Sequence, residues 1–266
     1  MFQLTREVRF SINPKDDKSS GVGLPTRNAG TNGFGGYPAI AGFGRYLCAQ
    51  VSLQGELDQK SQYLINIRDI DQDVRQLLPA LEKAMDRCRH YEQLARLLFE
   101  LMREKRPNLL KQVALKITPM LMMAINAEEY PMMRLSQKFE FSASHRLHNP
   151  ALSDADNRTI FGKCNNALGH GHNYEVQVNL IGTPDANGLL IAIPEFERVV
   201  NETVIDQFDH KHLNAEVPQF KTVIPSVENI AKVIFQLLSP ALKTAKSRLY
   251  SVVVWETPKT WCEYSE

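Results

Sequence analysis

Apolar and polar residues alternate along residues 137–145 and 172–183, and this period of two predicts a β-strand in each segment. The side chains expected on the buried faces are Phe139, Phe141, Ala143, Tyr174, Val176, Val178 and Leu180. A turn-forming sequence at 183–188 predicts a hairpin that leads into a strand at 189–193. β-Branched residues at 248–258 predict a closing strand.

Two further segments of the same half have apolar residues three and four positions apart, which predicts amphipathic helices at 194–208 and 226–238. Pro194 suits the first turn of the first helix, and Ser226 suits the N-cap of the second. The apolar stripes consist of Phe196, Val199, Val200, Val204 and Phe208, and of Val227, Ile230, Val233, Ile234 and Leu237. One unit of strands and helices is therefore expected in residues 131–266.

The N-terminal half repeats this order of segments. Residues 6–12, 45–58, 63–78, 91–102 and 113–119 match, in turn, 138–144, 172–185, 189–204, 227–238 and 252–258. A uniform shift also places Phe34, Gly35, Gly42 and Gly44 on Phe161, Gly162, Gly169 and Gly171. We therefore expect a tandem duplication, with two similar α+β lobes that join near Tyr130.

Composition restricts the possible partners. The 266 residues carry a formal net charge of +1, so no overall field favours nucleic acid or an anionic membrane. No apolar run reaches the length of a membrane-spanning helix, and the charged start of the chain does not resemble a signal peptide. The four cysteines form no CxxC pair, which is typical of reduced thiols in a cytoplasmic protein.

Three histidines are candidate metal ligands. His170 and His172 stand two apart at the start of a predicted strand, so their side chains point to the same side and can bind one ion. His145 ends the preceding strand and supplies a third imidazole once the two strands lie side by side. Three histidines that leave one coordination position open are typical of catalytic zinc. The alternative for each is a buried histidine that only forms hydrogen bonds.

Three residues near this group are candidates for proton transfer. Cys164 lies in a Gly/Asn-rich loop, and a nearby cation would lower the pKa of its thiol and make it a base or nucleophile. The alternative for Cys164 is a small buried apolar side chain. Asp209 and His210 are adjacent and could orient or relay a proton, and His212 is either another partner or simply exposed.

Two carboxylates are candidates for holding a ligand. Glu256 ends an apolar strand, where an unpaired carboxylate would be costly, so we expect it to accept paired N–H donors from a guanidine-like group. Glu228 stands two residues after Ser226, where the helix dipole alone favours an acid. Glu256 is therefore the stronger candidate.

Five motifs occur in a fixed order: FSASHRLH, FGKCNNALGHGHNY, DHKHLN, PSVENIA and WETP. Together they resemble the 6-pyruvoyltetrahydropterin synthase family and the related 6-carboxytetrahydropterin synthases of queuosine biosynthesis, over residues 137–264. The resemblance implies the tunnelling fold (T-fold), a four-stranded antiparallel sheet with two helices on one face, assembled into barrels. For this chain the expected fold is therefore α+β, with two tandem T-fold lobes.

The resemblance also implies roles for the candidate residues. It assigns zinc to His145, His170 and His172, catalysis to Cys164, Asp209 and His210, and pterin binding to Glu256 and Glu228. The substrate would be 7,8-dihydroneopterin triphosphate, which loses triphosphate to give 6-pyruvoyltetrahydropterin. The five residues between Cys164 and His170 resemble the pyruvoyl branch. The carboxy branch and a non-catalytic module that binds zinc and a pterin are the alternatives.

Residues 1–130 depart from the pattern of the second lobe. Pro14, Phe43, Arg45, Tyr37 and Ile117 replace His145, His170, His172, Cys164 and Glu256, and Asp86 with Arg87 loosely replaces Asp209 with His210. Glu92 does match Glu228. We therefore expect a degenerate lobe without a metal site. Because free sheet edges must be paired or covered, we also expect a homo-oligomer, with a trimer of two-lobed chains favoured.

Overall fold

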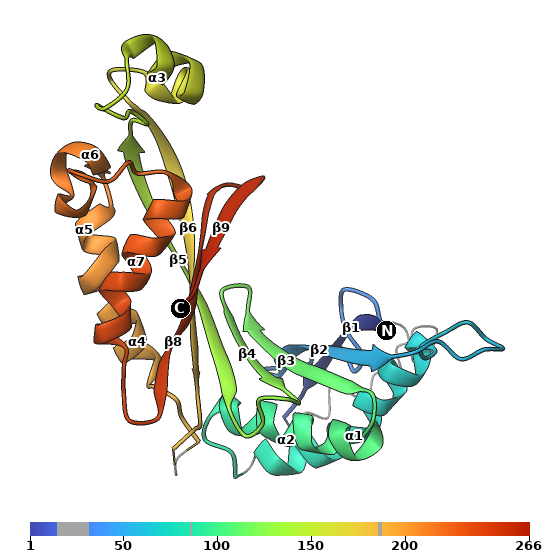
Figure 1. The fold of residues 1–266 in the computed structure, drawn as a ribbon. Helices are drawn as coiled ribbons and strands as arrows, with labels where there is room; N and C mark the ends of the chain where they lie inside the picture. Colours follow the sequence, from blue (N-terminus) through green and yellow to red (C-terminus); the bar gives the residue numbers. More distant parts are fainter. Residues whose placement is uncertain (15–31, 86, 186–187) are drawn as a thin grey trace. The chain divides into compact units, whose positions relative to one another are not determined.

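The computed structural model describes residues 1–14, 32–85, 87–185 and 188–266 (Figure 1). The chain divides into two compact units. The first comprises Met1–Leu135 with Thr183–Leu189, and the second comprises Ser136–Gly182 with Leu190–Glu266.

The first unit contains a four-stranded antiparallel sheet in the order β1-β2-β3-β4. Its elements are β1 (Phe2–Ile12), β2 (Arg45–Gly55), α1 (Ile67–Met85), α2 (Tyr91–Lys105), β3 (Leu110–Thr118) and β4 (Leu121–Asn126). In the β1–β2 ladder Phe2 pairs with Gly55 and Ile12 pairs with Arg45. Helix α1 packs on β1, and α2 packs on β3 and β4, so both helices lie on one face of the sheet (Figure 1).

The second unit has its own strands in the order β5-β6-β8-β9, and the short strand β7 pairs in parallel with β5. The strands are β5 (Met133–His145), β6 (His170–Gly182), β7 (Lys211–His212), β8 (Ser247–Thr257) and β9 (Thr260–Tyr264). The helices are α3 (Asp154–Phe161), α4 (Ile193–Val200), α5 (Asp206–Phe208), α6 (Leu213–Glu216) and α7 (Val227–Ala241), with 3₁₀ turns at Gly162–Asn165 and Pro218–Phe220. A π-helical turn, Asn201–Ile205, connects α4 to α5.

The predicted buried faces are largely confirmed in the second unit. Tyr174, Val176, Val178 and Leu180 are fully buried, and Phe196, Val200, Val204 and Phe208 form the buried stripe of the helix that covers them. Burying each such side chain stabilises the fold by roughly 1.5–3 kcal/mol. The predicted N-cap is also confirmed, because Ser226 Oγ accepts a hydrogen bond from Asn229 N.

The strand predicted at 189–193 is wrong. Residues 189–192 have no strand structure, and Ile193 begins α4 with Pro194 in its first turn. The fourth strand is instead β9, which forms a hairpin with β8. The first unit differs from the prediction in the same way, because residues 63–66 are not a strand and β4 completes the sheet. A short apolar run next to a helix start can follow either period, so local alternation did not distinguish the two structures.

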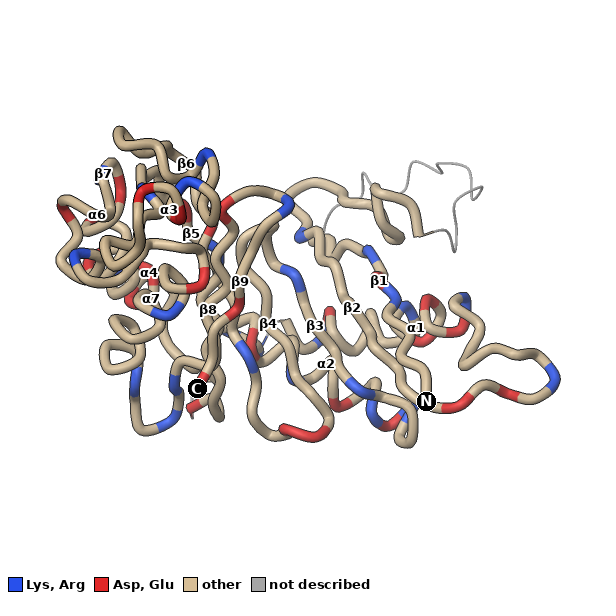
Figure 2. Tube along the Cα trace, turned by 45° about the horizontal axis from the view of Figure 1, so that its top comes forward, with Lys and Arg blue, Asp and Glu red and all other residues tan. Residues whose placement is uncertain are grey.

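Acidic and basic residues are interspersed along both units (Figure 2). Within the part of the chain that the structure describes, no helix is both long enough and apolar enough to cross a membrane.

Candidate metal centre

His145, His170 and His172 lie together at the ends of two neighbouring strands. His145 is the last residue of β5, and β6 begins at His170. One ligand nitrogen from each ring lies within 4.8 Å of the others. The ring centroids are 4.5 to 5.3 Å apart. The period of two along β6 and the register of β5 therefore bring the three imidazoles to one point, as the sequence predicts.

Gly169 allows this close approach. Its backbone has a φ of +73°, and a Cβ atom at this position would lie 2.8 Å from the carbonyl oxygen of His145 and 3.0 Å from His212 Nε2. A larger residue would push the start of β6 away from the end of β5, so glycine is required on both conformational and steric grounds.

His145 is held in a defined tautomer. Its side chain is 0% exposed, and its Nδ1 donates to the carbonyl oxygen of Pro225 at 2.6 Å. This bond leaves Nε2 as the nitrogen with a lone pair toward the other rings. Burial lowers the pKa of His145 to about 4, against the opposing effect of the Pro225 carbonyl, so the ring is neutral at pH 7. A neutral imidazole is the form that binds a metal.

The other two rings have unsatisfied nitrogens. His170 Nδ1 and His172 Nε2 are buried and have no hydrogen-bond partner among the described residues. Burial also lowers the pKa of His172. A buried polar atom without a partner is costly, and a metal ion held between the rings would satisfy His172 Nε2 together with His145 Nε2 and His170 Nε2, which lie 3.2 Å apart. Three imidazoles fit zinc and do not fit Mg²⁺ or Ca²⁺, which prefer oxygen ligands.

Glu256 in β8 lies beside the three histidines. Its Oε1 is 3.5 Å from His145 Nε2 and 3.9 Å from His172 Nε2, and its side chain is 21% exposed. Glu228, by contrast, is exposed in the first turn of α7, and no contact with the histidines is found for it within the described part of the chain. The structure therefore brings one of the two predicted ligand-binding carboxylates to the site.

Asp209 and His210 are attached to β5 through Ser142. Asp209 Oδ2 accepts from His210 Nδ1 at 2.7 Å, and its Oδ1 accepts from the Ser142 amide at 2.8 Å. The His210 amide in turn donates to the Ser142 carbonyl at 2.6 Å. The Ser142 amide and then His210 lower the pKa of Asp209, so this carboxylate is ionised at neutral pH. His210 has a left-handed backbone with φ +57°, and its side chain is 83% exposed.

One cavity is lined by a member of each group, His210 and His172. It has a volume of about 560 Å³ and is lined by Ser142, Ala143, Ser144, Gly171, His172, Asn173, His210, Lys211, His212 and Glu216. His172 and His210 therefore face the same space. His212, whose role the sequence leaves open, also lines the cavity, and its Nδ1 is buried without a partner among the described residues.

Cys164 lies in the 3₁₀ turn Gly162–Asn165, half-buried. Its carbonyl oxygen accepts from Leu147 N at 2.9 Å. Burial raises the pKa of Tyr174, and the nearby charges of Glu256 and Cys164 add to this effect. Tyr174 Oη in turn lies 3.4 Å from His145 Nδ1, and a position of Cys164 next to the histidines stays a prediction.

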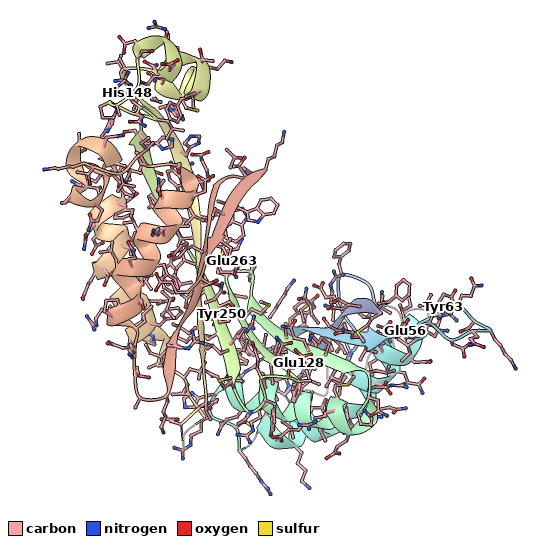
Figure 3. The ribbon with its side chains drawn as sticks, in the orientation of Figure 1. Glu56, Tyr63, Glu128, His148, Tyr250 and Glu263 are labelled. Atoms are coloured by element: carbon pink, nitrogen blue, oxygen red, sulfur yellow. The ribbon has the colours of Figure 1, made fainter. Side chains whose placement is uncertain are left out.

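Arg146 connects the Cys164 turn to the end of β5. Its Nε and Nη2 donate to the backbone and side-chain oxygens of Asn165 at 3.1 and 2.8 Å, and Asn214 holds its backbone on both sides. Asn165 Nδ2 also lies 3.4 Å from Nδ1 of His148, which Figure 3 labels below α3. No local pattern in the sequence indicated this network, because its bonds join residues that are far apart along the chain.

The corresponding positions of the first unit form no such group. Phe43 is 100% exposed, and Arg45 lies over the Tyr91 ring at 5.7 Å. Asp86 lies outside the described residues, so its match to Asp209 has no structural account. Across the described ranges, the three histidines are the one group of potential metal ligands found.

A family model described as 6-pyruvoyl tetrahydropterin synthase matches residues 134–266. The human 6-pyruvoyl tetrahydrobiopterin synthase is 41% identical over 125 residues, which cover 47% of this chain and 85% of the human protein. A 6-carboxy-5,6,7,8-tetrahydropterin synthase of Haemophilus influenzae is 28% identical over 156 residues, covering 51% of this chain and 100% of that protein. A crystal structure of uricase from Arthrobacter globiformis is similar in fold over 100% of this chain and 90% of that one, with a TM-score of 0.51 at 8% identity.

Proposed function

The chain belongs to the 6-pyruvoyl tetrahydropterin synthase family, and we propose that residues 131–266 form a zinc-dependent lyase that acts on 7,8-dihydroneopterin triphosphate. Elimination of triphosphate would give 6-pyruvoyltetrahydropterin. One observation carries this proposal: three histidine rings converge at one point, two of them with an unsatisfied buried nitrogen, and one of the three, His172, lines the cavity that His210 also lines.

The proposed roles follow from the contacts of each residue. His145, His170 and His172 would hold the zinc ion, which when bound would polarise the substrate hydroxyls and acidify the adjacent C–H bond. Cys164 would remove that proton, in a turn whose position Arg146 and Asn165 maintain.

The remaining site residues would move protons and orient the substrate. His210 would exchange protons with the substrate side chain, with Asp209 orienting its ring from a fixed position on β5. Glu256 would accept two N–H donors from the aminopyrimidine edge of the pterin.

For the first half of the chain we propose a scaffold role. Residues 1–130 would be a degenerate T-fold lobe that arose with the second lobe by duplication. The same order of strands and helices in the two units and the matching glycines support this proposal. A homo-oligomer of three cytoplasmic chains, in which like lobes gather, would pair the free sheet edges.

The product separates this function from its alternatives. Purified chain should be incubated with 7,8-dihydroneopterin triphosphate and Mg²⁺, and the products identified by mass spectrometry. We expect 6-pyruvoyltetrahydropterin and triphosphate, and no product from a His170→Ala/His172→Ala variant. A 6-carboxy product would assign the chain to the other branch, which the lower identity to the Haemophilus protein makes the weaker alternative. Bound but unchanged substrate would indicate a non-catalytic module.

A further inference from the structure

Glu92 in the first unit is a buried carboxylate without a clear partner. It lies in the first turn of α2 and is 2% exposed. Its Oε1 has no hydrogen-bond partner among the described residues. Burial raises the pKa of Glu92, and the charge of Asp185 acts in the same direction. The Glu92 amide and the charge of His90 oppose this effect, but Oε1 itself is left unsatisfied, and the burial of this atom costs free energy.

Helix capping does not explain this burial. The amides of Arg89 and His90 at the start of α2 donate to Gln93 Oε1 at 2.8 and 3.2 Å, so Gln93 performs the capping role. Glu228 occupies the matching position in the second unit, and there the carboxylate is exposed, as the helix dipole alone would allow. The dipole accounts for an acid at this position and does not account for its enclosure.

Glu92 lines a cavity of about 260 Å³ within the first unit. The cavity is lined by Glu92, Gln93, Arg96, Leu97, Glu100, Pro184, Asp185 and Gly188. Arg96 is the one basic residue among the described residues of the lining, and it already pairs with Glu100 at 2.9 Å. Because Arg96 pairs with Glu100, Glu92 Oε1 has no basic partner among the described residues of the lining, and this favours a cation.

The chemistry of the lining narrows the class of cation. Glu92 can accept two parallel N–H donors, which is the geometry in which carboxylates bind planar amidinium and guanidinium groups. Leu97 and Pro184 form an apolar part of the wall. A small hydrated metal ion would leave that part unfilled, whereas an organic cation would pack against it. We propose that this cavity binds a small amidinium or guanidinium compound through the Glu92 carboxylate.

Benzamidine and benzamide provide a matched pair of probes, since they share a ring and differ in charge and in the second N–H donor group. Binding to the full-length, zinc-loaded chain is measured by calorimetry. We expect benzamidine to bind and benzamide to bind at least about tenfold more weakly, because a charge-assisted bond is lost. Glu92→Gln, which keeps the shape of the side chain, should weaken benzamidine binding by about tenfold or more. Glu104→Gln, an exposed acid on the same helix, should leave it unchanged.

Turnover of the pterin substrate provides a control for folding and is expected to be unchanged in Glu92→Gln. Equal affinity for the two probes, no benzamidine binding at millimolar concentration, or full binding by a folded Glu92→Gln variant would each overturn the proposal. Because the readout is binding in the first unit, its failure would leave the proposed lyase activity of the second unit untouched.

Discussion

The ends of β1 and β2 differ from the ends of β5 and β6 in how their polar side chains are satisfied. At the end of β1, Asn13 donates to the carbonyl of Ala39 at 3.0 Å and accepts from Ala41 N at 2.9 Å, so the loop itself satisfies it. At the end of β5 and the start of β6, His170 Nδ1 and His172 Nε2 have no such partner among the described residues. The first arrangement closes a loop, and the second leaves ligand atoms available.

One pair of matched glycines is alike in the two places. Gly42 and Gly169 both have positive φ values, +53° and +73°. Gly44 approaches Asn13 so closely that a Cβ would lie 2.2 Å from its Oδ1. A left-handed glycine thus precedes the second strand in both units, whereas the residues around it determine whether the strand end carries a site. Four substitutions test this contrast, in order of decreasing expected effect.

The largest effect is expected for Cys164→Ala, which removes the proposed base where the first unit has Tyr37. General base catalysis contributes about 10²–10⁴-fold, so the turnover number should fall by that factor. Zinc content and thermal stability should stay close to those of the unchanged chain. A variant with near-normal turnover would show that Cys164 is only a structural thiol.

The second-largest effect is expected for Glu256→Gln, which should weaken substrate binding. The matching residue of the first unit, Ile117, offers no hydrogen-bond acceptor. Loss of a charge-assisted hydrogen bond, at about 1.5–3 kcal/mol, should raise the Michaelis constant by about tenfold or more. The control is Glu263→Gln in β9, labelled in Figure 3 and exposed. If zinc is lost from the Glu256→Gln variant, the carboxylate is a metal ligand and not a substrate anchor.

Arg146→Lys tests whether the Cys164 turn must be held in place. Lysine keeps the charge but cannot make the two bonds to Asn165. We expect a roughly tenfold lower turnover number with little change in the Michaelis constant, and a changed rate of Cys164 alkylation. Arg158→Lys in the exposed part of α3 is the matched control. An unaltered alkylation rate would argue against a positioning role.

The smallest effect is expected for Glu7→Gln in the first unit, where the carboxylate has basic partners. Lys116 and Arg9 lower the pKa of Glu7 from 4.5 to about 2, against the opposing effect of burial. The unfolded chain therefore takes up the proton first, and the stability from Glu7 is present above about pH 4.5 and is lost as the pH falls toward 2. Glu7→Gln should cost about 1–2 kcal/mol at pH 7 and flatten the acid side of a urea-midpoint profile. An unchanged profile would contradict this structural role.

Much of the second unit could be predicted from local patterns. The period of two placed Tyr174 and Val176 on a buried face, and the same parity placed His172 with them. The Pro225 carbonyl and the Asn165 bonds to Arg146 could not be predicted, because they join residues that are distant in the sequence. The burial of Glu92 could not be predicted either. The helix dipole explains an acid at the start of a helix, but burial depends on residues outside that helix. The roles of Cys164 and the other site residues stay predictions.

The central claim is that one unit carries a metal centre and the other does not. Elemental analysis of the purified, zinc-saturated chain tests it directly. The account predicts one zinc per chain, reduced to near zero in His170→Ala/His172→Ala. Two metals per chain, or zinc retained by the double variant, would contradict it.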